Sequence, residues 1–299
     1  MASATAPAGR SCALMNPTLA GMGLAALAGF CFSLLNTGMR VLTHDLPPFQ
    51  VQFLRYALGV VPLLPWLLRA GTAPLRPNGL GGQLLRGAVH SSGLFLWFAA
   101  LPHIPFAEMT AIGFTTPLFI MLGAVAFLGE RMMWQRWVAA LLGFFGVLVV
   151  VWPSLVGAEP TWSLVMLASS PLFAASFLIT KALTRRDGPA VIVLWQSLTV
   201  AMFSLPFALW AWQAPAPWHW GLALACGFLG TLGHWLLTSA FRLADISAAQ
   251  PVKFLDLLWA ATLGWLVFAE VPERATMIGA LVIFVATTWI ARVEAKRKA

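Results

Sequence analysis

Residues 115–150 read TTPLFIMLGAVAFLGERMMWQRWVAALLGFFGVLVV, which is two apolar runs joined by a short charged link. Each run belongs to an apolar segment of about 20 residues, the length that an α-helix needs to cross a bilayer core. Residues 254–291 read FLDLLWAATLGWLVFAEVPERATMIGALVIFVATTWIA and repeat the pattern at a shift of 140. The two stretches predict membrane-spanning helices that occur in duplicate.

The whole chain has the composition of a membrane protein. Of its 299 residues, 60% are hydrophobic and 9% are charged, whereas soluble domains are about one quarter charged. The predicted fold class is an all-α membrane protein with ten transmembrane helices. Turn residues and charges delimit the ten apolar segments, which are 17–38, 48–69, 82–101, 104–128, 132–152, 162–183, 189–211, 218–241, 246–268 and 273–292.

The basic residues predict the orientation of these segments. All but four of the 18 Lys and Arg residues fall on the side that would hold both chain ends. The exceptions are Arg40 and Arg274 on the other side, and Arg55 and Lys253 within segments. Since Lys and Arg concentrate in cytoplasmic loops, we expect both termini in the cytoplasm and the protein in the bacterial inner membrane. Orientation explains the net charge of +8, and we expect no nucleic-acid partner.

The two halves of the chain resemble each other. At a shift of 140, residues of the first half meet like residues of the second, among them the pairs Phe114/Phe254, Leu118/Leu258, Glu130/Glu270 and Phe144/Phe284. We expect two repeats of five helices, residues 17–152 and 162–292, between a cytoplasmic segment 1–16 and a basic tail 293–299. Because five is odd, the second repeat is inverted in the membrane. Inverted repeats are typical of secondary transporters that work by alternating access.

Three short motifs carry a resemblance to a known family. They are Thr-Pro-Leu at residues 116–118, Gly-Glu-Arg at residues 129–131 and Arg-Tyr at residues 55–56. With the paired five-helix repeats, they resemble the drug/metabolite transporter superfamily with two EamA-type domains, over residues 17–292. The second repeat departs from the family at residues 268–273, FAEVPE, where members often have Gly-Glu. The resemblance implies a transporter rather than an enzyme.

The end of the second repeat is most similar to a group of proteobacterial members of that family. The group includes exporters of opine-type metallophores such as pseudopaline, and uptake proteins for riboflavin and S-adenosylmethionine. The resemblance implies an exporter of such a metallophore, with uptake of riboflavin or S-adenosylmethionine as the alternative.

Gln250, Lys253 and Asp256 lie inside the ninth segment. Polar and ionisable residues are costly in hydrocarbon, so they are candidates for function. Lys253 and Asp256 are expected on one face of a helix, about 10 and 15 Å along the axis from residue 246. The pair either lines a substrate site near the midplane, where transporter sites lie, or is a self-neutralising structural pair.

Five further residues are candidates for binding substrate or coupling ions. Arg55 either extends toward the membrane surface or holds an anion. His90 and His234 occupy nearly equivalent repeat positions; they either couple transport to protons or are packed neutral residues. Glu108 either interacts with the dipole of its helix or binds a proton or substrate. Trp97 either lines an aromatic cavity or packs in the core.

The predicted substrate is a small anionic or zwitterionic metabolite, because Arg55, Lys253 and the two histidines would make the cavity rich in cationic groups. Neither GxxxxGK[ST] nor HExxH occurs, so we expect no nucleotide, cofactor or metal site; an intramembrane enzyme is the distant alternative. We expect Glu130 and Glu270 to interact with the N-termini of segments 132–152 and 273–292. Glycines spaced by three are expected to let the repeats approach closely; they are Gly227, Gly230 and Gly233.

Overall fold

The computed structural model describes residues 16–100, 103, 112–151, 160–269 and 274–296. This part of the chain is helical and holds no strand, as predicted for the fold class. Six helical segments within it are long and apolar enough to span a membrane. The elements are α1 (Pro17–Leu42), α2 (Pro48–Leu58), η1 (Val61–Leu63), α3 (Leu64–Ala70), η2 (Ala73–Leu75), α4 (Leu80–Ala100), α6 (Thr116–Leu128), α7 (Trp134–Val151), α8 (Pro160–Leu183), α9 (Pro189–Trp210), α10 (Pro217–Leu243), α11 (Ile246–Lys253), α12 (Asp256–Phe268) and α13 (Arg274–Lys296).

Local sequence explains where many of these helices begin and end. Five of them start on proline, whose fixed φ and missing N–H suit the first helical position. At the start of α1, the side chain of Asn16 accepts a hydrogen bond from the backbone of Thr18. Helix α6 ends at Gly129 with a φ of 69°, and α12 ends at Ala269 with a φ of 56°. These two positions are 140 residues apart, so equivalent helices of the repeats end in the same left-handed conformation.

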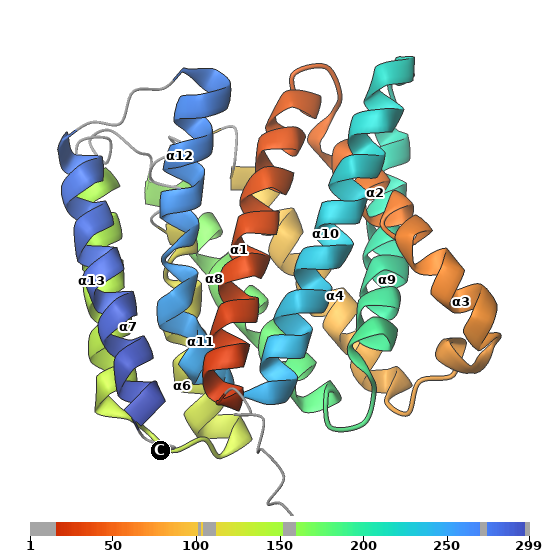
Figure 1. Ribbon diagram of the computed structural model, residues 1–299. Helices are drawn as coiled ribbons and strands as arrows, with labels where there is room; N and C mark the ends of the chain where they lie inside the picture. Colours follow the sequence, from red (N-terminus) through yellow and green to blue (C-terminus); the bar gives the residue numbers. More distant parts are fainter. Residues whose placement is uncertain (1–15, 101–102, 104–111, 152–159, 270–273, 297–299) are drawn as a thin grey trace, which may run out of the picture.

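The helices pack side by side, and the contacts exchange between the two halves (Figure 1). Helix α1 packs on α10 of the other half, as α4 packs on α8. Likewise, α2 packs on α10, and its repeat equivalent α9 packs on α4. Two further contacts join equivalent helices directly, α2 with α9 and α7 with α13. The ends of the described chain lie on one side, where the Asn16 side-chain amide donates a hydrogen bond to the Glu294 carbonyl.

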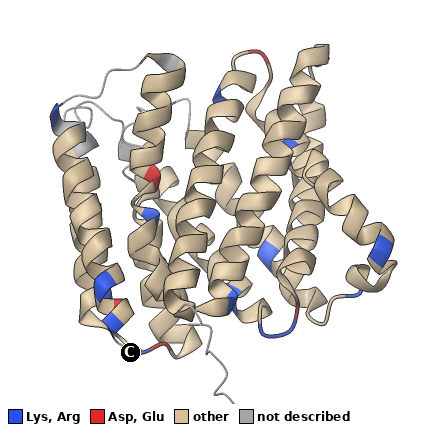
Figure 2. Cartoon of the chain, in the orientation of Figure 1, with Lys and Arg blue, Asp and Glu red and all other residues tan. Residues whose placement is uncertain are grey.

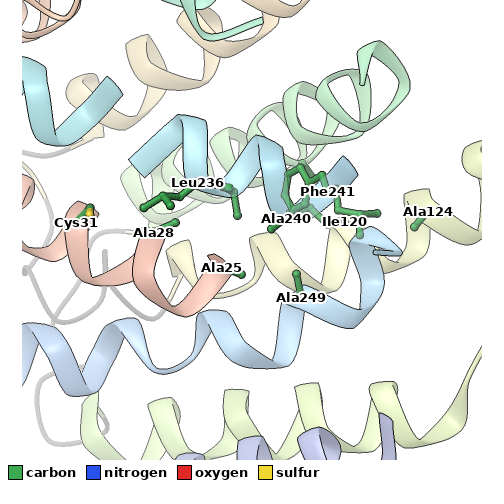
Figure 3. Close-up of a cluster of buried hydrophobic side chains, with 12 residues drawn as sticks. Ala25, Ala28, Cys31, Ile120, Ala124, Leu236, Ala240, Phe241 and Ala249 are labelled. Carbon is green, nitrogen blue, oxygen red and sulfur yellow. The ribbon is translucent and has the colours of Figure 1, made fainter. Parts of the chain in front are cut away.

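Small side chains allow the central helices to approach closely. Figure 3 shows this core, in which α1, α6, α10 and α11 meet. Alanines such as Ala25, Ala28, Ala124 and Ala240 are at most 1% exposed. Because lipid is as apolar as the core, membrane helices associate through close packing of small residues rather than through exclusion of water. Large apolar side chains face outward instead, as Phe127 does at 81% exposure.

Two segments expected to be continuous helices are interrupted. Segment 48–69 is divided by η1, and segment 246–268 is divided between Lys253 and Asp256. At the second break the chain makes i to i+3 hydrogen bonds, from Leu255 to Val252 and from Leu258 to Leu255. The chain around the start of α6 makes the same pair of bonds 140 residues earlier. The turn before α12 and the turn at the start of α6 are therefore short 3₁₀ turns at equivalent places in the two halves. Such turns are often found at hinges.

Charged side chains lie mostly toward the end of the bundle that holds the chain ends (Figure 2). Two arginines from the orientation count are buried within helices of the bundle. Arg86 is 1% exposed inside α4, and Arg136 is 4% exposed inside α7. Both side chains make hydrogen bonds within the protein.

Candidate functional site

A group of polar side chains meets in the interior of the bundle, and we call it the arginine–histidine cluster. Its members come from α2, α4, α8, α9 and α10, and they are Arg55, Tyr56, Arg86, His90, Ser176, Gln196 and His234. Each of them is at most 9% exposed. Such a concentration of polar groups among apolar spans is costly in a membrane, so it points to function.

One branch of the cluster joins its two arginines. Arg86 donates hydrogen bonds to the Ile192 carbonyl at 3.0 Å and to the Gln196 side-chain oxygen at 2.5 Å. The amide nitrogen of Gln196 and Nη2 of Arg55 each lie 3.4 Å from Nε2 of His234. Both of these groups can only donate, so Nε2 of His234 is an acceptor and the imidazole is neutral.

The second branch is centred on His90. The Tyr56 hydroxyl lies 3.0 Å from Nε2 of this histidine, and the Ser176 hydroxyl lies 3.2 Å from Nδ1. The rings of His90 and His234 are 6.0 Å apart between centroids, so the two branches form one group. The two candidate histidines predicted from the sequence are thus brought together, with Arg55 beside them.

The cluster carries two guanidinium charges, and no carboxylate of the described chain bonds to either. Arg55 lies over the ring of Tyr56 at 4.4 Å, and its Nε has no hydrogen-bond partner among the described residues. Nε of Arg86 is likewise unpaired there. Both amide atoms of Gln52, a residue of α2 that is 2% exposed, also lack a partner within the described chain. The site therefore offers unused hydrogen-bonding groups and uncompensated positive charge.

Lys253 and Asp256 form a second polar centre at the break between α11 and α12. The lysine donates to the aspartate at 2.5 Å, since positions i and i+3 eclipse in a 3₁₀ turn. The other oxygen of Asp256 faces Gly29 of α1 and has no partner among the described residues. Phe32 lies between the centres, with its ring 5.3 Å from the Lys253 ammonium and 4.9 Å from the His234 ring.

Two further candidates have partners outside the arginine–histidine cluster. Gln250 is buried, and its amide donates to the Ile246 carbonyl of its own helix at 2.7 Å. Trp97 packs on a small apolar cluster with Ala100 and Met166. Glu108 lies outside the described residues. Neither Gln250 nor Trp97 contacts the arginine–histidine cluster in the described structure.

Some polar residues in and beside the cluster were not predicted from the sequence. Arg86 was assigned to the orientation signal, and Gln52, Gln196 and Ser176 were passed over. A signal did exist for the arginine, because Arg86 and His90 are four residues apart and share one face of a helix. The glutamines carry no such signal, because amide residues occur equally in structural roles.

A charged network lies at the end of the bundle that holds the chain ends. Arg136 binds Glu294 at 2.8 Å and Asp245 at 3.0 Å. Lys181 donates to the carbonyls of Phe241 and Ala244 at the end of α10. The network lines two pockets of about 320 and 540 Å³. It therefore ties the two halves together at this end of the bundle.

The prediction for Glu130 was wrong in its partner. The carboxylate accepts hydrogen bonds from the backbone nitrogens of Ile246 and Ser247 and from the Ser247 hydroxyl. It thus caps α11 of the other half rather than the helix that follows it, because the left-handed turn at Gly129 directs the chain across the repeat interface. Its equivalent, Glu270, lies outside the described residues.

The glycine prediction is confirmed for the close approach of the halves. Gly227 lies against the backbone of Leu58 and Gly59, and Gly230 lies against the Arg55 guanidinium. A third glycine of α10, Gly233, lies against the ring of Phe32. At these three positions helix α10 therefore approaches α1 and α2 of the first half without a side chain of its own in between.

Comparisons with known proteins agree on one class. The model of a family described as EamA-like transporter family matches residues 19–152 and 160–292. The S-adenosylmethionine uptake transporter of Rickettsia felis is 30% identical over 278 residues, covering 93% of this chain and 94% of the relative. The riboflavin transporter of Rhizobium johnstonii is 34% identical, covering 91% of each chain. The pseudopaline exporter of Pseudomonas aeruginosa is 29% identical, covering 92% of this chain and 96% of the relative.

A solved crystal structure shares the fold. Its TM-score is 0.78 at 20% sequence identity, and the match covers 94% of this chain and 98% of the other. At that identity the likeness shows the arrangement of helices alone.

Proposed function

Because this chain belongs to the EamA-like transporter family, we propose that it is a secondary transporter that moves a small anionic or zwitterionic metabolite across the bacterial inner membrane by alternating access. The resemblance found in the sequence is confirmed by the family match, and the relatives are named as transporters, not enzymes. The observation that carries the substrate class is the pair of buried guanidinium groups without a carboxylate partner among the described residues. An anionic substrate group would supply the missing charge.

The mechanism we propose uses ten helices in two inverted repeats. The exchange of helix contacts between halves supports it, as do the equivalent 3₁₀ turns before α6 and α12. A related pair of contacts supports it further. Asp45 bonds His219 at 3.1 Å at one end of the bundle, and Asp187 bonds Asn78 at 2.9 Å at the other. In each case an acid just before a proline-headed helix holds the start of a helix in the other half.

We place both termini in the cytoplasm. The described ends meet where most basic residues gather (Figure 2), and basic residues concentrate on the cytoplasmic face. The charged network then lies at the cytoplasmic end. Protons are the proposed coupling ion, because two histidines lie in the arginine–histidine cluster.

For direction, we propose export of an opine-type metallophore of the pseudopaline class, by analogy with the pseudopaline exporter of Pseudomonas aeruginosa. Uptake of S-adenosylmethionine or riboflavin is the second candidate, favoured by relatives of 30% and 34% identity. Metabolite profiling of a deletion strain separates these possibilities. An exporter leaves its substrate accumulated in the cells and missing from the medium, and complementation restores both. Loss of uptake of supplied S-adenosylmethionine or riboflavin, with an unchanged medium, would refute export.

A further inference from the structure

We propose that the arginine–histidine cluster binds a carboxylate group of the substrate between Arg55 and Arg86, with Gln52 as a third binding residue. This inference rests on the proposed transport function and deepens it. It names the chemical group recognised and adds Arg86 and Gln52 to the site.

The first step is the state of the two guanidinium groups. A buried charge is strongly unfavourable unless a counter-charge and hydrogen bonds compensate it. Arg86 is 1% exposed and donates only to a carbonyl and to the neutral side chain of Gln196. Arg55 has an imidazole and an aromatic ring as its described partners. The described residues thus leave two positive charges to be met by a ligand.

The second step is geometry. A guanidinium is planar and offers N–H groups in a fork that matches the two oxygens of a carboxylate. In both arginines Nη2 is used within the cluster, whereas Nε is unpaired among the described residues. One glutamine and one histidine link the two side chains. The two arginines therefore belong to one hydrogen-bonded network, and we place the anionic group between them.

The third step concerns Gln52. Burying an amide without hydrogen bonds is costly, and buried polar groups with no partner need an explanation such as a bound ligand or water. Gln52 lies three and four residues before Arg55 and Tyr56, so it projects from the same face of α2, one turn away. Its amide can donate to a carboxylate oxygen held by the arginines. The unused hydrogen-bonding groups of the site are mostly donors, which favours an acceptor ligand over a cation.

The test uses small anions, because a fragment of the right chemistry reports the site whatever the full substrate is. The melting temperature of the purified protein in detergent is measured in sodium acetate, sodium chloride and sodium phosphate of equal ionic strength. The variants are R86Q, R55Q and Q52M. R185Q is the matched control, since Arg185 is exposed and lies outside the cluster.

We expect acetate to raise the melting temperature of the wild type above its value in chloride. The concentration for the half-maximal shift should rise about tenfold or more in R86Q and R55Q, as for loss of a charge-assisted hydrogen bond. It should rise less in Q52M and stay unchanged in R185Q. R86K keeps the positive charge but lacks the planar guanidinium, and it replaces R86Q in the test if R86Q does not give a monodisperse protein. R86K should also weaken the effect of acetate on the melting temperature.

Equal shifts in the wild type and the cluster variants would overturn the proposal, as would equal melting temperatures in acetate and chloride. A larger shift in phosphate than in acetate would assign the site to a phosphate group instead, and the proposal would be wrong. Failure of the proposed transport function would give a different result from failure of the carboxylate site. In that case acetate binding persists, but proteoliposomes containing the protein show no flux of the solutes identified by metabolite profiling.

Discussion

At the scale of single residues, Gly230 decides where the guanidinium of Arg55 can lie. A Cβ at this position would be 3.0 Å from Nε of Arg55, which is tighter than an ordinary contact. We expect G230A to displace Arg55 from His234 and to weaken substrate binding by about tenfold, the effect of losing roughly one hydrogen bond to a charged group. G221A is the control, because nothing lies within 4 Å of a Cβ there. Transport assays of the two variants check this, and equal activity would contradict it.

Gly29 has the same relation to the second polar centre. A Cβ on this residue would overlap the free oxygen of Asp256, whereas a Cβ on Gly23 of the same helix meets nothing within 4 Å. We expect G29A to break the Lys253–Asp256 pair or to separate α1 from α12, with a cost of about 1–3 kcal/mol for overpacking. Thermal unfolding of G29A and G23A in detergent measures the difference. A stable G29A protein would mean that this contact has room to adjust.

How far the sequence predicts the site depends on which kind of residue is considered. Arg55, His90 and His234 were found because charge or titration inside an apolar span is rare and therefore informative. Arg86 was misassigned because it lies six residues into its helix, where a basic residue resembles one that flanks a span. Gln52 could not be recognised, since its burial and missing partners are properties of packing.

At the scale of secondary structure, Glu130 controls the start of a helix 116 residues away in the chain. Its carboxylate satisfies two backbone N–H groups of α11 and lies at the positive end of the helix dipole. We expect E130A to lower stability by about 1–2 kcal/mol, the usual cost of removing a cap. E130Q should lose less, since its oxygen still accepts. Thermal unfolding distinguishes the two, and wild-type stability in both variants would show that the capping bonds contribute nothing.

The sequence predicted which segments are helices better than it predicted their continuity. Apolar length alone indicates a span, so segment 246–268 was expected to be one helix. The 3₁₀ turn at Phe254 and Leu255 needs tertiary contacts to stabilise it. Phe254 stacks on its repeat equivalent Phe114 at 5.5 Å between ring centroids, and this contact is visible only once the halves are assembled.

At the scale of the whole molecule, the charged network holds the two halves together at the end with the chain termini. Arg136 of the first half bonds Asp245, Ser247 and Glu294 of the second. In the proposed alternating-access mechanism each end opens in turn, so these bonds would break when this end opens. We expect R136Q to shift the population toward the conformation open at this end. A change of about 3 kcal/mol, typical of breaking a buried ion pair, would shift that equilibrium by about two orders of magnitude.

Thiol labelling measures this shift. Thr18 is buried and lines the pocket beside Arg136, so a cysteine placed there by T18C reports opening. In membrane vesicles that expose this side, T18C should react with a membrane-impermeant maleimide faster in the R136Q background than beside the native arginine. R131Q is the control, because Arg131 is exposed and lies near the network without belonging to it. If labelling is equally fast in all three backgrounds, the network does not hold this end closed.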